Sequence, residues 1–157
     1  MPPSPMIRVR RAARDDLPVI VEFNAAMALE TEGKSLDPDT LRIGAEHALA
    51  DPSRAAYFLA ELDDRVVGQT MFTVEWSEWR NSFFWWVQSV YVLPAFRGRG
   101  VFRALYEHVR GDARKRPDVG GIRLYVHAAN RSAMLAYERL GMKLTEYKVY
   151  EEDWSSP

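Results

Sequence analysis

The segment SVYVLPAFRGRGVFRALYEHV, residues 89–109, constrains the fold more than any other part of the chain. It begins with alternating β-branched residues and reaches a proline that cannot continue a strand ladder. A basic loop with two glycines follows, and Val101, Leu105 and Val109 then recur at helical spacing. The segment therefore predicts a strand, a turn, a glycine-rich loop and a helix that ends near residue 115.

The loop predicts an anion site. Gly98 and Gly100 leave backbone amides unshielded at a helix start, where the first N–H groups lack intrahelical acceptors and the helix dipole is positive. Arg97 and Arg99 add fixed positive charge. A Walker loop is excluded because no Lys–Ser/Thr pair follows the second glycine, and a dinucleotide fingerprint because a third glycine is missing. The alternative is a plain connection between strand and helix.

Composition narrows the function classes. We expect one domain over residues 1–157, with residues 1–5 as a flexible N-terminal tail. A formal net charge of -1 gives no general attraction to nucleic acid or to an anionic membrane. The absence of cysteine excludes disulfides, thiolate metal sites and a cysteine nucleophile, and the three histidines lack metal-ligand spacing. Without a signal peptide or an apolar span, we expect a cytoplasmic protein with no metal and no nucleic-acid or membrane partner.

Periodicity and turn residues predict the order β-α-α-β-β-β-α-β-α-β, an α/β fold with helices on both faces of a mixed central sheet. The expected strands are residues 6–10, 55–62, 66–76, 83–92, 122–126 and 142–150. The expected helices lie between about residue 16 and Gly33, between residues 37 and 51, from residue 101 to about 115, and between Asn130 and Gly141. Residues 63–64 form a tight turn and residues 117–121 a loop. Aromatic residues on both faces of strand 83–92 indicate a central strand covered by helices on each side.

Two motifs and this order of elements resemble the GCN5-related N-acetyltransferase (GNAT) family over nearly the whole chain. Residues 97–102, RGRGVF, match the family's coenzyme A loop, which reads Arg or Gln, two residues, Gly, one residue, then Gly or Ala. Phe102 departs from the pattern because it replaces the small last residue. Residues 122–144 match the family's strand, Asn, Tyr-bearing helix and Leu-Gly-Phe, with Met142 in place of Phe.

The resemblance implies acetyl-CoA as cosubstrate and direct transfer of its acetyl group to a primary amine in a ternary complex. It implies a bulge in strand 83–92 that frees the backbone amide near Val90 to polarise the acetyl carbonyl. Tyr137 would act as general acid toward the leaving thiolate; the alternative is a core aromatic on the helix stripe. Asn130 would touch the coenzyme, serve as a helix N-cap, or do both. The predicted coenzyme-binding residues are Val90, Tyr91, Val92, Arg97, Gly98, Arg99, Gly100, Val101, Phe102, Asn130 and Tyr137.

The acceptor side is predicted less fully. Glu30, Glu32, Trp76 and Glu78 are candidates for an acceptor pocket, because carboxylates and ring faces attract a cationic amine. Each carboxylate is more simply explained as a solvated surface group, and no general base is assigned. The acceptor is a small-molecule or peptide amine, and a homodimer stays open. Two other functions remain: a coenzyme-binding or regulatory module without turnover, and an acyltransferase that uses another acyl-CoA.

Overall fold

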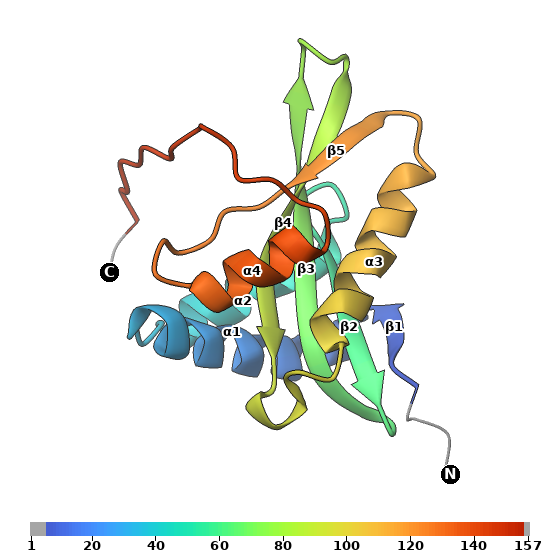
Figure 1. Ribbon diagram of the computed structural model, residues 1–157. Coiled ribbons are helices and arrows are strands. Elements are labelled where there is room, and N and C mark those ends of the chain that lie inside the picture. The colour runs from blue at the N-terminus through green and yellow to red at the C-terminus, as the bar shows by residue number, and fades with distance from the viewer. Residues whose placement is uncertain (1–5, 156–157) are drawn as a thin grey trace. The chain divides into compact units, whose positions relative to one another are not determined.

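The computed structural model describes residues 6–155, which divide into two compact units after Tyr125 (Figure 1). The predicted tail, residues 1–5, lies outside the described residues. The first unit contains, in chain order, β1 (Arg8–Arg11), the 3₁₀ turn η1 (Arg14–Asp16), α1 (Leu17–Glu32), α2 (Pro38–Ala50), β2 (Ala56–Leu62), β3 (Arg65–Ser77), β4 (Ser82–Val92), the 3₁₀ turn η2 (Pro94–Phe96), α3 (Val101–Arg114) and β5 (Val119–Arg123). The second unit contains α4 (Arg131–Arg139).

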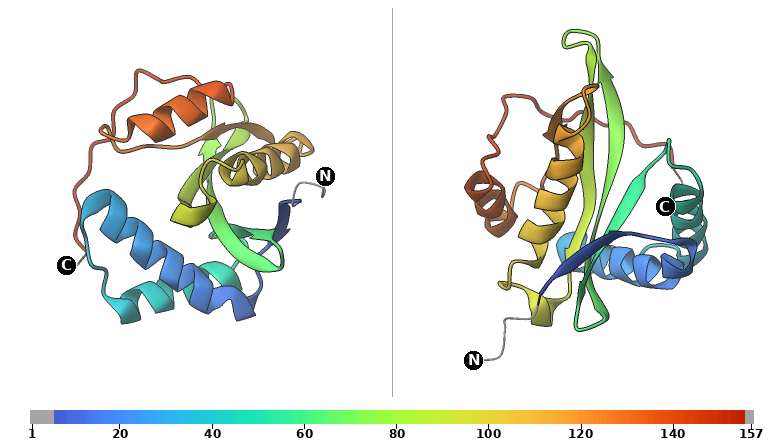
Figure 2. Two further views of the ribbon diagram at one scale, coloured as in Figure 1. Left: turned by 60° about the horizontal axis from the view of Figure 1, so that its bottom comes forward. Right: turned by 90° about the vertical axis from the view of Figure 1, so that its right-hand side faces the viewer.

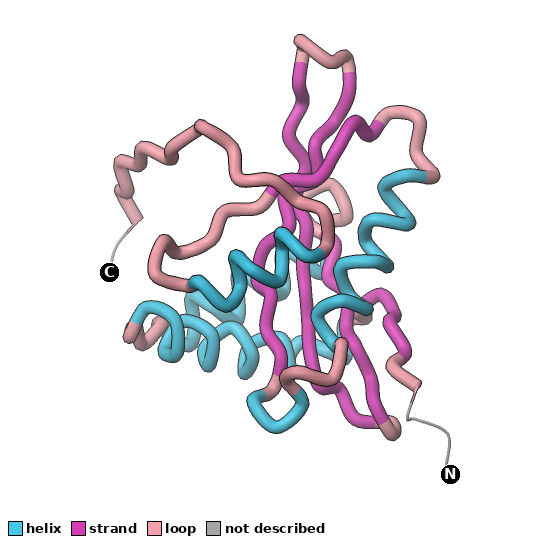
Figure 3. Tube along the Cα trace, viewed as in Figure 1, coloured by secondary structure: helices cyan, strands magenta, loops and turns pink. Residues whose placement is uncertain are grey.

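The first unit is built on one mixed sheet with the strand order β1-β2-β3-β4-β5. The pairs β1–β2, β2–β3 and β3–β4 are antiparallel, and β5 is parallel to β4. Asp63 and Asp64 both have positive φ angles, +49° and +58°, as a two-residue type I′ hairpin requires. The mixed sheet confirms the predicted α/β fold class (Figure 3).

Helices cover both faces of this sheet, because its strands are apolar on both sides. Alternate β2 residues divide between two cores: Phe58 packs with Leu105 of α3, whereas Leu59 packs with Ile20 of α1 and Ala45 of α2. Figure 2 shows α3 on one side of the sheet and α1 and α2 on the other. Within residues 6–155, no helix is both long and apolar enough to cross a bilayer.

Two strands differ from the sequence prediction by more than one residue at an end. β1 occupies Arg8–Arg11 instead of residues 6–10. β5 occupies Val119–Arg123, so the prediction of a loop over 117–121 and a strand over 122–126 is wrong. The pair Gly120 and Gly121 reads as a loop in sequence, but a Cβ at Gly121 would lie 2.6 Å from a ring carbon of Phe84. These glycines let the edge strand approach the ring, which is why a strand contains them.

The predicted strand over 142–150 is also wrong. These residues form no strand in the described chain, and all but the first are exposed. Their alternation of apolar and polar side chains suits a half-buried strand, but a strand also needs a neighbour to satisfy its backbone groups.

Two arginine side chains of the first unit cover one aromatic ring of β4. Phe84 lies under the guanidinium groups of Arg80 and Arg123, at 5.0 and 4.1 Å from the ring centroid. Arg123 also donates to Glu75 of β3 at 3.1 Å. Cation–π contacts therefore stabilise this ring within the first unit.

Candidate functional site

A β-bulge interrupts β4 near its end. The register of the β3–β4 ladder shifts between Gln69 and Met71, so that Ser89 and Val90 together stand opposite one β3 residue. Ser89 has a φ angle of +52°, in the left-handed region. The bulge that the resemblance implies is therefore present at the expected position.

The bulge reverses which β4 side chains face α3. Before it, Trp85 and Val87 belong to the α3-side core; after it, Val92 belongs to that core and Val90 packs against it. An uninterrupted strand would direct the two pairs to opposite faces, because side chains alternate. The insertion of one residue thus keeps both pairs buried while it breaks the regular ladder.

Gln69 supports the bulge from β3. Its Nε2 donates to the Ser89 carbonyl oxygen at 3.1 Å, and the side chain is fully buried. The Gln69 Oε1 has no hydrogen-bond partner in the described chain. The sequence analysis missed this residue, although a glutamine inside an apolar strand was the available signal.

β4 is open along one edge beyond the bulge. The β4–β5 ladder extends only from Phe83 to Trp86. The following part of β4, with Val90, Tyr91 and Val92, has no partner strand on that side among residues 6–155. An edge of this kind offers backbone donors and acceptors to an extended ligand.

The loop after η2 delivers two glycines to the start of α3. Gly98 and Gly100 have φ angles of +73° and +83°, and nothing lies within 4 Å of the position of an added Cβ. The glycines are therefore required by backbone conformation and not by lack of space. The first helical hydrogen bond joins the Ala104 N–H to the Gly100 carbonyl, so the amides of residues 101–103 precede it. These amides and the adjacent loop have the geometry of a helix start that suits an anion.

Gly68 of β3 fixes the position of that helix start. An added Cβ would lie 2.9 Å from Val101 Cγ1 and 3.1 Å from the Tyr91 carbonyl oxygen. The first turn of α3 therefore lies directly on the sheet beside β4. Phe102, where the family has a small residue, packs against the α3-side core with its ring 6.2 Å from that of Tyr106.

The predicted arginines of the loop differ in their surroundings. Arg97 forms two contacts with Glu30 of α1, at 2.5 and 2.8 Å. Arg99 lies 5.4 Å from the Phe96 ring centroid, as does Arg65 at the start of β3. Neither Arg65 nor Arg99 has a carboxylate partner in the described chain. Arg65, which precedes Arg97 by 32 residues, was not among the predicted site residues.

The candidate acceptor residues lie at two distant ends of the first unit. Glu30 is linked to the end of β4 by Arg97, which contacts both Glu30 and the Val92 carbonyl oxygen. Glu32 pairs with Lys34 at 3.7 Å. Trp76 is opposite Phe83 at the other end of β4, and Glu78 is in the hairpin that follows. The nine residues from Phe83 to Val92 correspond to roughly 30 Å of strand. The structure therefore does not bring these four residues together.

The second unit carries Asn130 and Tyr137. The Asn130 Oδ1 accepts from the Ala133 N–H at 3.1 Å, so Asn130 caps α4. Tyr137 is half-buried on the helix stripe with Ala133 and Leu140. Burial raises the pKa of the Tyr137 phenol above its ordinary value of 10.0. The phenol is therefore protonated at neutral pH, as an ordinary tyrosine is, and burial makes it a weaker acid.

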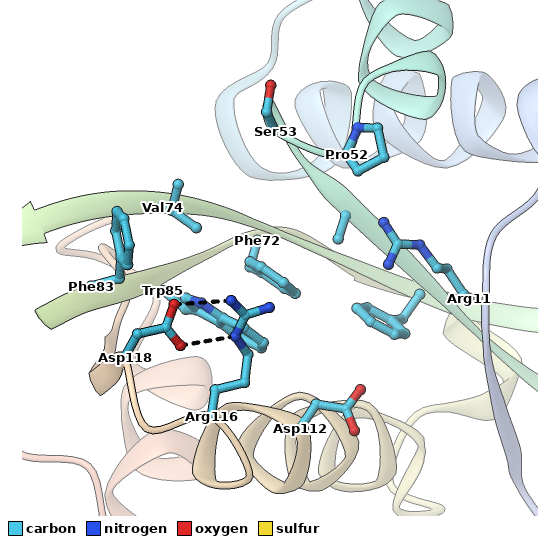
Figure 4. Close-up of a pocket in the computed structure, with 12 residues that line it drawn as sticks. Arg11, Pro52, Ser53, Phe72, Val74, Phe83, Trp85, Asp112, Arg116 and Asp118 are labelled. Atoms are coloured by element: carbon cyan, nitrogen blue, oxygen red, sulfur yellow. Dashed lines mark hydrogen bonds and ion pairs between the residues drawn. The ribbon is translucent and has the colours of Figure 1, made fainter.

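A cavity of about 540 Å³ lies elsewhere in the first unit, on the α3 side of the sheet (Figure 4). Its aromatic wall includes Phe72 and Trp85, whose rings stack at 3.8 Å, and Arg116 and Asp118 form an ion pair at its rim. None of the predicted site residues lines it.

The chain is similar to a known protein family and to solved structures. The family model described as the acetyltransferase (GNAT) family matches residues 20–142. A possible acetyltransferase from Clostridium difficile 630 is 40% identical, with a TM-score of 0.88 over 96% of this chain and 99% of that one. No curated protein matches.

More distant solved structures share the fold. A ribosomal-protein-alanine N-acetyltransferase from Brucella melitensis biovar Abortus 2308 is 19% identical, with a TM-score of 0.77 over 96% of this chain and all of that one. A predicted acetyltransferase from Clostridium acetobutylicum, solved with acetyl-CoA, is 17% identical, with a TM-score of 0.76 over 94% of this chain and 96% of that one.

Proposed function

Since the chain belongs to the acetyltransferase (GNAT) family, we propose that it transfers the acetyl group of acetyl-CoA to a primary amine by direct transfer in a ternary complex. The observation that carries the proposal is the continuous path from the β4 bulge, along the open β4 edge, to the glycine loop at the start of α3. A neighbour in the same fold was solved with acetyl-CoA, which supports this choice of cosubstrate.

The residues on this path suit the two ends of the coenzyme. Loop amides around Gly98 and Gly100, together with the Arg99 side chain, provide donors and positive charge for a pyrophosphate. The edge of Val90 and Val92 provides backbone groups for an amide-containing arm. When bound, acetyl-CoA supplies an activated acetyl group and a thiolate leaving group.

The chain's own residues then meet the remaining requirements. Val90 belongs to the bulge in the ladder, and we propose that its amide donates to the carbonyl oxygen as negative charge develops. Tyr137 donates a proton to the thiolate, whose pKa is about 8.5 if it resembles that of cysteine. The phenol is protonated at neutral pH and is available for this step; burial raises its pKa, which makes it a weaker acid. The chain has no cysteine to carry an acetyl group, which favours direct transfer.

The acceptor amine must lose a proton before it attacks. An amine with a pKa near 10.4 is neutral only about once in 10³ molecules at pH 7. Glu30 does not suit the role of base, because its hydrogen bond to Arg97 lowers the pKa of its carboxyl group. Proton loss to water is therefore the route that we propose.

The test is a thiol-release assay with acetyl-CoA and a panel of diamines, aminoglycosides, amino acids and short peptides. We expect turnover with at least one amine, and Tyr137→Phe lowers kcat by about 10²–10⁴. Tyr147→Phe is the matched control, because Tyr147 is an exposed tyrosine of the same unit. Coenzyme binding without thiol release from any amine would indicate a binding module, and faster turnover with a longer acyl-CoA would indicate another donor. Absence of coenzyme binding would refute the proposal.

A further inference from the structure

The guanidinium of Arg97 is fully engaged within the first unit. Its Nη1 and Nη2 donate to the two Glu30 carboxylate oxygens at 2.5 and 2.8 Å, and its Nε donates to the Val92 carbonyl oxygen at 2.9 Å. The group also lies 5.6 Å from the Tyr91 ring centroid. Every nitrogen of the side chain therefore has an acceptor in the protein, and a bidentate carboxylate fixes its plane.

These contacts join α1 to the segment that leads into the glycine loop at the start of α3, residues 97–100, which we call the anion loop. Tyr91 packs against Phe23 of α1, with ring centroids 5.2 Å apart, and Glu30 follows Phe23 by about 10 Å of helix. Arg97 itself is the residue before Gly98. The loop is thus linked to α1 through Arg97.

We propose that Glu30 and Arg97 are a positioning pair for the anion loop, and that Arg99, not Arg97, supplies the side-chain charge to the coenzyme. This inference rests on the proposed function. Arg99 suits the role because it lies beside the loop glycines without a carboxylate partner in the described chain. Arg97, by contrast, acts through the backbone of the loop that it holds.

The two possible roles of Arg97, binding the pyrophosphate or positioning the loop, predict opposite effects of Glu30→Gln on coenzyme binding. Glu30→Gln removes a negative charge and leaves one acceptor where two are needed. If Arg97 bound the pyrophosphate and Glu30 only competed for it, the substitution would free the guanidinium and tighten coenzyme binding. If the pair positions the loop, the substitution weakens coenzyme binding, and we expect about a five-fold rise in Kd.

The experiment is calorimetric titration of the full chain with acetyl-CoA. Glu32→Gln is the matched control, because Glu32 lies at the same helix end and, among residues 6–155, forms its ion pair with Lys34 and not with an arginine of the loop. Both side chains of the Glu30–Arg97 pair are 43% exposed, so Glu30→Gln leaves the protein folded. Arg97→Gln weakens binding by a similar factor, and the double variant binds no more weakly than either single one. Arg99→Gln weakens acetyl-CoA binding both in the wild type and in each of these variants.

If Glu30→Gln binds acetyl-CoA more tightly than the wild type, the inference is wrong. It is also wrong if Arg97→Gln weakens acetyl-CoA binding by the same factor in the wild type and in the Glu30→Gln variant. Hydrogen exchange of the amides of residues 96–100 gives a second readout that needs no ligand. Glu30→Gln accelerates this exchange about five-fold and Glu32→Gln does not; equal exchange in both variants overturns the inference. If the wild type fails to bind acetyl-CoA, the proposed function fails, while the exchange measurement still decides the role of the pair.

Discussion

Replacement of Gly68 by alanine should dislodge the first turn of α3. The added methyl carbon would lie 2.9 Å from Val101 Cγ1, closer than real Cβ contacts, and 3.1 Å from the Tyr91 carbonyl oxygen. The Val101 side chain is buried and short, and the carbonyl belongs to β4, so neither can move alone. The helix start must therefore shift away from the sheet.

The magnitude follows from two opposing effects. Overpacking in a filled core costs about 1–3 kcal/mol, while a Gly→Ala change stabilises by about 0.4–1 kcal/mol because it restricts the unfolded chain. The net loss is about 1–2 kcal/mol of the free energy of unfolding. For a chain of this length this loss lowers Tm by roughly 2–8 °C. Because the displaced residues carry the anion loop, Kd for acetyl-CoA should rise as well.

Circular dichroism melting and coenzyme titration test the two parts together. Gly111→Ala in α3 is the matched control, since nothing lies within 4 Å of its added Cβ and helix propensity favours alanine. We expect Gly111→Ala to raise Tm slightly and to leave coenzyme binding unchanged. A Gly68→Ala protein that melts like Gly111→Ala, with wild-type coenzyme binding, would refute the argument that close approach holds the α3 start.

Three further results are expected. Gly121→Ala places a Cβ 2.6 Å from a facing ring carbon and should lower Tm by several degrees in the same melting assay, since β5 must move off β4. Arg10 lowers the pKa of both Asp16 and Glu61 by hydrogen bonds, so the stability that these carboxylates contribute is present above about pH 4.5 and is lost as pH falls through their lowered values. Urea unfolding should show a smaller difference between pH 7 and pH 3 for Arg10→Gln than for the wild type. The kcat of the wild type should fall only above pH 10, where the phenol of Tyr137 ionises, and Tyr137→Phe should lack this alkaline fall.

The sequence predicts the elements whose ends are marked by local chemistry. Gly33 has a φ angle of +64° at the end of α1, Asp37 accepts from the Thr40 N–H at the start of α2, and Gly141 has a φ angle of +91° after α4. Such signals act within a few residues, so they can be read from the chain. β5 was misplaced because the glycines at its start are explained only by the ring of Phe84, which is distant in sequence.

The candidate site also combines a local motif, which the sequence predicts, with long-range contacts, which it does not. The glycine loop is a local motif, and the structure has it between β4 and α3, where the sequence predicts a loop. The Glu30–Arg97 pair and the hydrogen bond from Gln69 to the Ser89 carbonyl join residues 67 and 20 positions apart. No periodicity or spacing rule connects such positions, because register and helix packing bring them together.

Strand length decides which candidate acceptor residues can act together. Val90 lies seven residues from Phe83, the partner of Trp76, which is roughly 23 Å along β4. A small amine attacking a carbonyl held at the Val90 amide cannot also reach the hairpin of Trp76 and Glu78. Glu30, by contrast, is attached to the end of the same strand through Arg97 and Val92. Within the first unit, a small acceptor should therefore meet α1 and not the hairpin, and only an extended acceptor such as a peptide could contact both.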